Sequence, residues 1–234
     1  MTKAAQIIAE LKRISTPERA AGAARFFKTK PGEYGYGDVF LGVTMPQTHA
    51  LTKQCPDLSL AEIEKLLASK FHEARVVGVL CLVDASKRGD RKIKKMIFDF
   101  YLQHADRVNN WDLVDLSAPA VIGGYLLLAP RAAVLQKLSR SKNMWARRIA
   151  ILATLSFIRA GQFADTFWLA EKYLSDREDL MHKATGWMLR EIGKRDAGAL
   201  KSFLNRFRNG MPRTMLRYAI ERFSPAERAS LMKK

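Results

Sequence analysis

Residues 145–152 read WARRIAIL, and three other stretches of the chain follow the same pattern. They are EARVVGVL (73–80), MHKATGWM (181–188) and MPRTMLRY (211–218). All four have a basic residue at the third position: Arg75, Arg147, Lys183 and Arg213. Three have a small residue at the sixth position: Gly78, Ala150 and Gly186. The last three copies begin 36 and 30 residues apart, a period typical of solenoids built from stacked helix pairs.

The repeat also predicts how the helices pack. Each copy falls in the second helix of an expected pair, as in residues 59–86 and 165–195. We expect the small residue to let neighbouring helices approach closely, and the basic residues to recur along one continuous positive groove. Chance similarity between amphipathic helices is the alternative explanation of the pattern.

Helical periodicity continues outside the repeat. Ile63, Leu66 and Leu67 recur at the spacing of one helix face, and Ser59 precedes Glu62 by three residues, the signature of a capping box. Runs of alternating polar and apolar residues joined by hairpin turns are absent. We therefore predict an all-α solenoid of about six helix pairs, forming a single domain over residues 1–234.

One segment interrupts the helical pattern. Residues 28–38 read KTKPGEYGYGD, with one proline and three glycines, and this composition predicts a loop. The glycines are spaced G-x-x-G-x-G rather than G-x-G-x-x-G, and no strand precedes them. A dinucleotide-binding loop is therefore excluded here.

The charge of the chain favours polyanionic partners. Lys and Arg number 40 against 23 acidic residues, which gives a net charge of +17 and a pI near 10.1. Residues 140–234 carry 20 basic and 9 acidic residues, so they contribute +11. Such a field attracts nucleic acid first and an anionic membrane surface second. A basic surface that serves only solubility is the other interpretation.

The cysteines and the apolar stretches predict the compartment. Cys55 and Cys81 are too few for a disulfide scaffold and suit a reducing environment. The most apolar stretch, residues 118–129, is too short to span a bilayer. We expect a soluble cytoplasmic protein without a membrane partner.

Several common kinds of chemistry lack their motifs. The chain has no H-E-x-x-H and no C-x-x-C, so neither a metalloprotease nor a zinc deaminase site is expected, and we predict no metal. P-loop and Gly-x-Ser-x-Gly motifs are also absent. We expect no cofactor.

The stretch NNWDLVDLSAP, residues 109–119, carries the remaining chemistry. Asn109 or Asn110 can cap a helix, which would place Asp112 in the first turn, where the helix dipole favours a carboxylate. Asp115 lies four residues after Trp111, so the two share one helix face. A ring beside a carboxylate can hold a planar or cationic group. A capped helix with a packed tryptophan is the simpler alternative.

The other tryptophans differ in their surroundings. Trp187 has Lys183 four residues before it and Arg190 three residues after it. Trp145 stands next to a cationic pair in MWARR. Flanking charges predict a wet edge for Trp111 and Trp187, whereas Trp168 in TFWLAEKYL is expected in the core.

Three segments together resemble the AlkD family of DNA alkylation-repair glycosylases: RVNNWDLVDLSAP (107–119), SKNMWARRIAIL (141–152) and HKATGWMLREIGKRD (182–196). The stretch ARFFKTKPGEYGYGDVFLGVTMP (24–46) is similar to that family's N-terminal signature. The resemblance implies HEAT-like helical repeats that wrap double-stranded DNA in a basic concave groove. It also implies removal of N3- and N7-alkylated purines.

The resemblance assigns roles to individual residues. Trp111 and Trp187 match the two indoles that line the lesion site, and Asp115 matches the catalytic carboxylate. Arg148 matches the arginine that contacts the DNA backbone beside the lesion. Phe26 falls where the family often has a tyrosine, so any hydrogen bond from that hydroxyl is lost here. From their repeat positions and flanking places, we add these DNA-binding candidates: Arg147, Lys183, Arg190 and Arg213.

These roles predict a simple reaction. An alkylated purine is cationic and leaves as a neutral base, so the reaction needs an anion near the sugar and a water molecule. The resemblance implies that the lesion stays stacked in the duplex. We expect a monomer without lyase activity. A catalytically silent DNA-binding scaffold and a HEAT-type protein-interaction module are the two alternatives.

Overall fold

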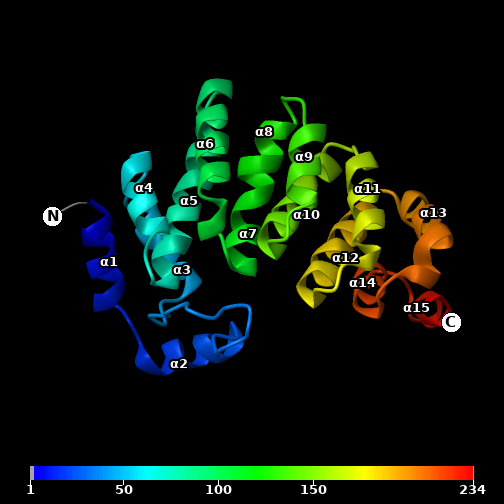
Figure 1. The fold of residues 1–234 in the computed structure, drawn as a ribbon, viewed down its shortest axis with the longest axis horizontal. Coiled ribbons are helices and arrows are strands. Elements are labelled where there is room, and N and C mark those ends of the chain that lie inside the picture. Colours follow the sequence, from blue (N-terminus) through cyan, green and yellow to red (C-terminus); the bar gives the residue numbers. More distant parts are fainter. Residues whose placement is uncertain (1–2, 234) are drawn as a thin grey trace. The chain divides into compact units, whose positions relative to one another are not determined.

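A computed structural model gives the fold of residues 3–233 (Figure 1). Helices make up its regular structure, and the β-type pairing found within this range is one isolated parallel bridge between Val39 and Phe71. The all-α prediction is confirmed. The chain divides into two compact units, of which the first ends at Val121 and the second begins at Ile122.

The first unit is built around one buried helix. Its helices are α1 (Lys3–Arg13), α2 (Pro17–Phe26), α3 (Met45–Lys53), α4 (Leu60–Leu67), α5 (His72–Arg88), α6 (Arg91–Gln103) and α7 (Trp111–Ala118), with a 3-10 turn at Ala105–Arg107. Helix α5 packs against α3, α4, α6 and α7 and is therefore buried on nearly every side. A π-helical segment, Pro119–Gly123, follows α7 and contains the boundary between the units.

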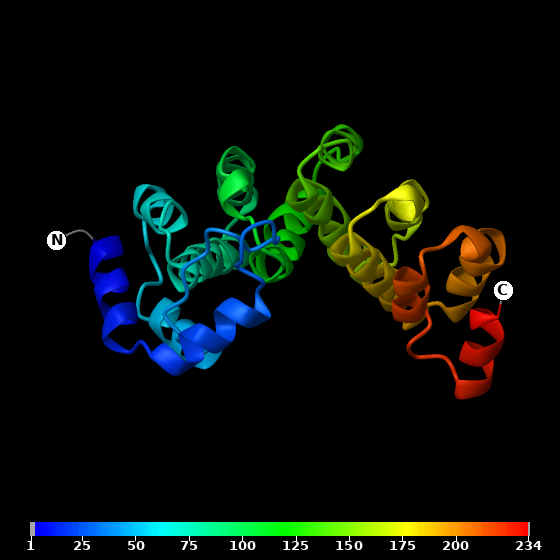
Figure 2. The ribbon, with the colours of Figure 1, turned by 60° about the horizontal axis from the view of Figure 1, so that its bottom comes forward.

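The predicted loop lies in this unit. Residues 28–38 are non-helical and pass over α5 (Figure 2). The chain then runs from the Val39 bridge into an extended stretch that ends at α3. Gly42 has a φ of +76°, and a Cβ on it would lie 2.3 Å from the carbonyl oxygen of Thr16. Only glycine fits this close approach of loop to α2.

The capping box predicted for α4 forms only in half. The Ser59 side chain accepts from the backbone nitrogen of Glu62, as expected. The Glu62 carboxylate, however, accepts from the backbone nitrogen of Ala4 at 2.7 Å and pairs with Lys65. A tertiary partner at the start of α1 therefore replaces the local bond, and it ties α1 to α4.

The second unit follows the same plan around two central helices. Its helices are α8 (Gly124–Leu126), α9 (Ala132–Ser139), α10 (Met144–Arg159), α11 (Ala164–Lys172), α12 (Asp179–Gly193), α13 (Ala197–Phe207), α14 (Arg213–Ala219) and α15 (Pro225–Met232), with 3-10 turns at Tyr173–Ser175 and Arg208–Gly210. Helix α10 packs on α9, α11 and α12, and α12 packs on α10, α11, α13 and α14.

The small residue at the sixth repeat position lies at close helix contacts, as the sequence predicts. A Cβ on Gly186 would lie 2.5 Å from the carbonyl oxygen of Met215, so glycine allows α12 to touch α14. A Cβ on Gly78 would lie 3.1 Å from a methyl group of Leu67, across the α4–α5 contact. Ala150 is fully buried. Helix pairs α4–α5 and α11–α12 also match the predicted pairs.

Two further observations concern surfaces. Trp168, expected in the core, is 41% exposed on α11, so that prediction is wrong. The apolar face of α11 is supplied instead by Leu169 and Ala170, which are fully buried. In residues 3–233 no helix combines the length and the apolar character that crossing a membrane requires.

Candidate functional site

Helix α7 presents the predicted pair on a common face. The Asn110 side chain caps the helix by accepting from the backbone nitrogen of Trp111 at 2.8 Å. Trp111 and Asp115, one turn apart, are both half-buried, whereas Leu113 and Val114 between them are fully buried. The predicted cap and the shared, partly accessible face are therefore present.

A buried phenol supports the second half of α7. The Tyr101 hydroxyl lies 2.8 Å from that of Ser117, and the Ser117 hydroxyl donates to the Leu113 carbonyl at 2.6 Å. Burial raises the pKa of Tyr101 above its usual range, and the nearby Asp115 charge adds to this effect. Tyr101 therefore stays neutral and adds no second anion beside Asp115.

A set of packed aromatic rings, in which Phe27, Phe40 and the His72 ring all contact one another, fixes the plane of the Trp111 indole. Trp111 stacks on Phe27 with ring centroids 5.1 Å apart, Phe27 stacks on Phe40 at 4.8 Å, and Phe40 stacks on the His72 ring at 4.5 Å. Phe26, which is 66% exposed, meets Trp111 edge-on at 5.8 Å. The structure thus brings Phe26 next to Trp111.

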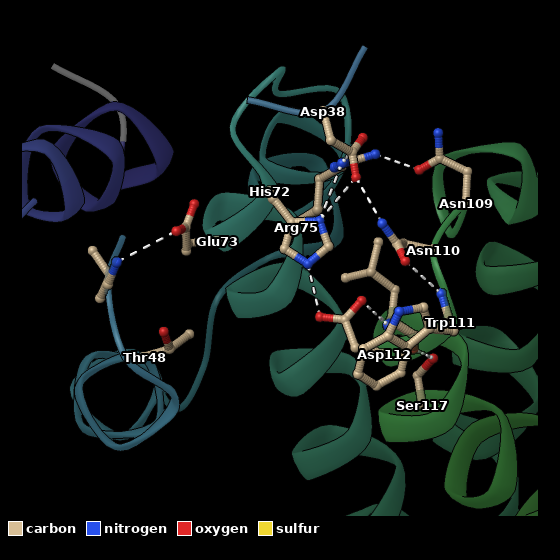
Figure 3. Close-up of polar contacts among 12 residues, drawn as sticks. Asp38, Thr48, His72, Glu73, Arg75, Asn109, Asn110, Trp111, Asp112 and Ser117 are labelled. Carbon is tan, nitrogen blue, oxygen red and sulfur yellow. Dashed lines mark hydrogen bonds and ion pairs between the residues drawn. The ribbon is translucent and has the colours of Figure 1, made fainter. Parts of the chain in front are cut away.

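His72 packs against Phe27 and Phe40 and lies between two carboxylates (Figure 3). Its Nδ1 is 3.0 Å from Asp38, and its Nε2 is 2.7 Å from Asp112. Burial alone would lower the pKa of His72, but the hydrogen bonds to Asp112 and Asp38 outweigh burial and raise it. A ring with a carboxylate at each nitrogen is best satisfied as imidazolium, which donates from both.

Asp38 connects this histidine to an arginine. Arg75 pairs with Asp38 at 2.5 Å and also bonds the side chain of Asn109, and Asn110 donates to Asp38 at 3.0 Å. Burial opposes the charged form of Asp38, but the bond to His72 and the Arg75 charge lower its pKa. We call Asp38, His72, Arg75 and Asp112 the His72 cluster.

The His72 cluster changes two expectations. Arg75 occupies the basic repeat position predicted for a positive groove, but its side chain is buried against Asp38, so it does not belong to that surface. Asp112 was expected to act through the helix dipole in the first turn of α7. It lies in that turn, and it also carries the bond to His72.

Glu73 attaches the stretch that follows the loop to α5, next to the His72 cluster. Its buried carboxylate accepts from the backbone nitrogens of Leu41 at 3.0 Å, Gly42 at 2.8 Å and Val43 at 3.3 Å. Three backbone donors satisfy a charge that would be costly to bury alone. The stretch that follows the loop is therefore fixed to the first turn of α5, the turn that also carries His72.

In the second unit, Trp187 is held by a neighbour on its own helix. The residue is half-buried, and its indole Nε1 donates to Glu191 at 3.1 Å. Lys183 pairs with Asp179 at 2.8 Å, and Arg190 pairs with Glu221. The partial exposure agrees with the predicted wet edge for Trp187.

The remaining basic candidates also make intramolecular bonds. Arg147 binds Asp176 at 2.7 Å, and Arg213 donates to the Met232 carbonyl at 2.6 Å. Arg148 is only 4% exposed and donates to the Leu180 carbonyl at 2.6 Å. Their contacts with DNA stay predictions, as do those of Lys183 and Arg190.

Comparison with known families identifies the chain. The sequence profile of the DNA alkylation repair enzymes matches residues 7–223. The chain belongs to the DNA alkylation repair enzyme family. Its structure is similar to that of a predicted DNA alkylation repair enzyme from Enterococcus faecalis, with a TM-score of 0.72 and 19% sequence identity over 90% of this chain and 97% of that chain. Comparison with curated proteins gives no significant match.

Within this family member, sequence reasoning missed the His72 cluster. His72 carries no local motif, and its partners lie 34 and 40 residues away in the sequence. Asp38 closes the Gly-rich loop, and the glycine spacing of that loop excludes a dinucleotide site without indicating any other role. Among residues 3–233, no group of three or more His, Cys, Asp or Glu side chains is arranged to hold a metal ion.

Proposed function

We propose that this family member is a monofunctional DNA glycosylase, which hydrolyses the N-glycosidic bond of cationic N3- and N7-alkylpurines in double-stranded DNA. Family membership supports the repair role. The observation that carries the choice of reaction is the pair on α7: a half-buried carboxylate, Asp115, one turn after an indole of fixed plane, Trp111.

The chemistry needs little more than an anion. Alkylation at N3 or N7 gives the purine a positive charge, so cleavage of the bond to the sugar releases a neutral base without a general acid. Positive charge then develops on the sugar as an oxocarbenium ion. The Asp115 carboxylate stabilises this charge and orients the attacking water, whose oxygen bonds to the sugar carbon while one of its protons passes to the solvent.

The two tryptophans supply selectivity for a charged lesion. An indole face attracts a cation by about 1 kcal/mol or more when the site excludes water. Because Trp111 is stacked on Phe27 and Trp187 is held through Glu191, both rings are already oriented before DNA binds. Preorganised rings lose little conformational entropy on binding. This preference for cationic bases requires no hydrogen bond to a base edge.

The basic residues of the second half provide DNA affinity in this proposal. The formal charge of +17, most of it from residues 140–234, favours the phosphate backbone. Arg148 is oriented by the Leu180 carbonyl and is the proposed contact beside the lesion. The other proposed phosphate contacts are Arg147, Lys183, Arg190 and Arg213.

The test is single-turnover release of 7-methylguanine from a methylated duplex by purified variants. Asp115→Asn preserves the shape of the side chain and removes the anion, so the rate should fall about 100-fold or more. DNA affinity should stay equal or rise slightly, since a negative charge near the phosphates is gone. Asp99→Asn, an exposed carboxylate paired with Lys95 on α6, is the matched control and should keep the wild-type rate.

Each alternative predicts a different outcome. A silent scaffold binds the duplex tightly and releases no base from any alkylated substrate. A protein-interaction module neither binds nor cleaves it. If Asp115→Asn excised at the wild-type rate, Asp115 would not be the catalytic carboxylate.

A further inference from the structure

His72 joins two segments that carry the proposed site. It lies in the first turn of α5, with a side chain only 3% exposed. On one side it contacts Asp38, the last residue of the loop that follows Phe26 and Phe27. On the other side it contacts Asp112, the immediate neighbour of Trp111. In Figure 3 the ring points one nitrogen at each carboxylate.

We propose that His72 is a positioning residue for the glycosylase reaction: its two carboxylate bonds hold the first turn of α7 against the loop, and thereby orient the Trp111 indole and the Asp115 carboxylate. This proposal rests on the proposed function. It assigns a role to a buried group that the reaction itself does not use.

The charges around His72 explain why both bonds need a proton. Asp38 faces it from the loop, Asp112 from α7, and Arg75 from its own helix, with an Arg75 nitrogen 3.4 Å from Nδ1. The ring of Phe40 stacks on it, and the ring of Phe27 packs against it at a tilt. With a protonated ring, two positive and two negative groups balance. A neutral ring can donate to only one carboxylate, so one of the two segments loses its bond.

Loss of that bond should disturb orientation more than fold. Helix α7 keeps its Asn110 cap and its attachment through Tyr101 and Ser117. The first turn, however, would be released from α5 at Asp112. A displacement of about 1 Å at a reacting group can lower a rate by about 100-fold. The defect should therefore appear in the rate of base release rather than in DNA affinity.

The decisive variant is His72→Phe, which keeps a ring on Phe40 and removes both nitrogens. We expect the single-turnover rate of 7-methylguanine release to fall 10- to 100-fold, with the affinity for the duplex changed less than about threefold. His104→Phe is the matched control. His104 also packs against a phenylalanine, Phe100, at 4.2 Å and pairs with a carboxylate, Glu64, at 3.2 Å, but it caps the end of α6. Its rate should stay at the wild-type value.

A pH profile separates positioning from mere stability. The wild-type rate should fall at alkaline pH with the loss of one proton, and His104→Phe should keep this alkaline limb. His72→Phe, measured under conditions where circular dichroism shows it folded, should have a low rate without that limb.

The outcomes are distinct. If the wild type releases no base, the proposed function fails, and this proposal falls with it. If the wild type is active but folded His72→Phe stays within twofold of its rate, only the positioning role is overturned. If His72→Phe does not fold, His72→Gln is judged by the same criteria. Should that variant also fail to fold, a wild-type rate that is flat from neutral to alkaline pH overturns the role.

Discussion

The two units place an arginine at the same repeat position and use it differently. Arg75 on α5 pairs with Asp38, and Arg147 on α10 pairs with Asp176. In the second unit the other hydrogen bonds around this arginine involve backbone carbonyls. The Arg147 side chain also donates to the carbonyls of Ser141 and Lys142. The Tyr173 hydroxyl donates to the Arg147 carbonyl.

In the first unit the arginine is only the beginning of a longer chain of interactions. Asp38 continues to His72, and His72 continues to Asp112 on the helix that carries Asp115. An arginine at the same repeat position therefore stabilises only its own surroundings in the second unit, whereas in the first unit it is connected to the candidate site. A basic repeat residue cannot be assigned to a DNA-binding groove from its position alone.

The largest difference should appear when each arginine is removed. Arg75→Met removes one of the two cationic partners of the buried Asp38, so we expect a loss of about 3 kcal/mol in the free energy of unfolding. Arg147→Met breaks a pair whose arginine is more exposed, 16% against 5%, and should cost about 1 to 2 kcal/mol. Urea titrations of both variants measure these values. Equal losses would mean that the two ion pairs contribute equally to the stability of the fold.

Activity should separate the two arginines further. Folded Arg75→Met should release base about tenfold more slowly, because the His72 cluster is disturbed beside α7. Arg147→Met should keep the rate of the bound complex and lose only DNA affinity. A rate defect in Arg147→Met at saturating enzyme would contradict this division.

Trp111 in the first unit and Trp187 in the second test the selectivity for a charged base. Trp111→Ala and Trp187→Ala should each slow release of a cationic base by about 10-fold, roughly the value of one cation–π contact in a dry site. The affinity for a duplex that carries a neutral alkylated base should change less than the affinity for a duplex that carries a cationic one. Trp168→Ala, an exposed indole on α11, is the control and should behave as the wild type. An equal effect on charged and neutral lesions would remove the cation–π argument.

The pH dependence of stability should reflect the first unit. The pKa of His72 is raised in the folded state, so its contribution is complete below the unfolded pKa of about 6.5 and is lost as the pH rises through the folded pKa. The pKa of Asp38 is lowered, so its contribution is present above about pH 3.9 and is lost as the pH falls through the folded pKa.

Urea titrations across the alkaline range measure the histidine contribution. The slope should not exceed about 1.4 kcal/mol per pH unit, the value for one proton. His72→Phe should lack this loss, and Arg147→Met should retain it, because an arginine stays charged over the whole range. An alkaline loss of the same size in His72→Phe would assign it to another group.

The smallest expected effect concerns salt. DNA affinity should fall linearly on a log-log plot against salt concentration, and removal of one phosphate-binding side chain should reduce the slope by about 0.9. Lys183→Ala should produce that change, because its partner Asp179 is exposed and can release it to a phosphate. Lys95→Ala, which pairs with Asp99 on α6, is the control. An unchanged slope in Lys183→Ala would remove this residue from the proposed interface.

The sequence predicts this fold well where the cause is local. The 3.6-residue period, the Asn110 cap and the small residue at Gly186 each act within one helix or one helix contact. Trp168 is exposed against expectation because a tryptophan among apolar residues says nothing about which side of α11 faces inward. The Ser59–Glu62 box forms only in half because Ala4, which is far away in the sequence, offers a better donor.

In the candidate site, too, the residues related by local spacing are predictable and the residues that meet across the sequence are not. Trp111 and Asp115 are predictable because four residues separate two positions on one helix face. The His72 cluster is not, because Asn110 and Asp38 meet across 72 residues and His72 meets Asp112 across 40. Such interactions depend on how the loop, α5 and α7 pack, which no local spacing encodes.

In the proposed reaction, the anion on α7 helps a cationic base, and not a neutral one, to leave. The most direct measurement is single-turnover release from two duplexes that differ only in the lesion, 7-methylguanine or the neutral O6-methylguanine, with the wild-type protein in excess. We expect free 7-methylguanine and an intact abasic strand from the first duplex, and no detectable release from the second. Equal release from both, or release from neither, would contradict it.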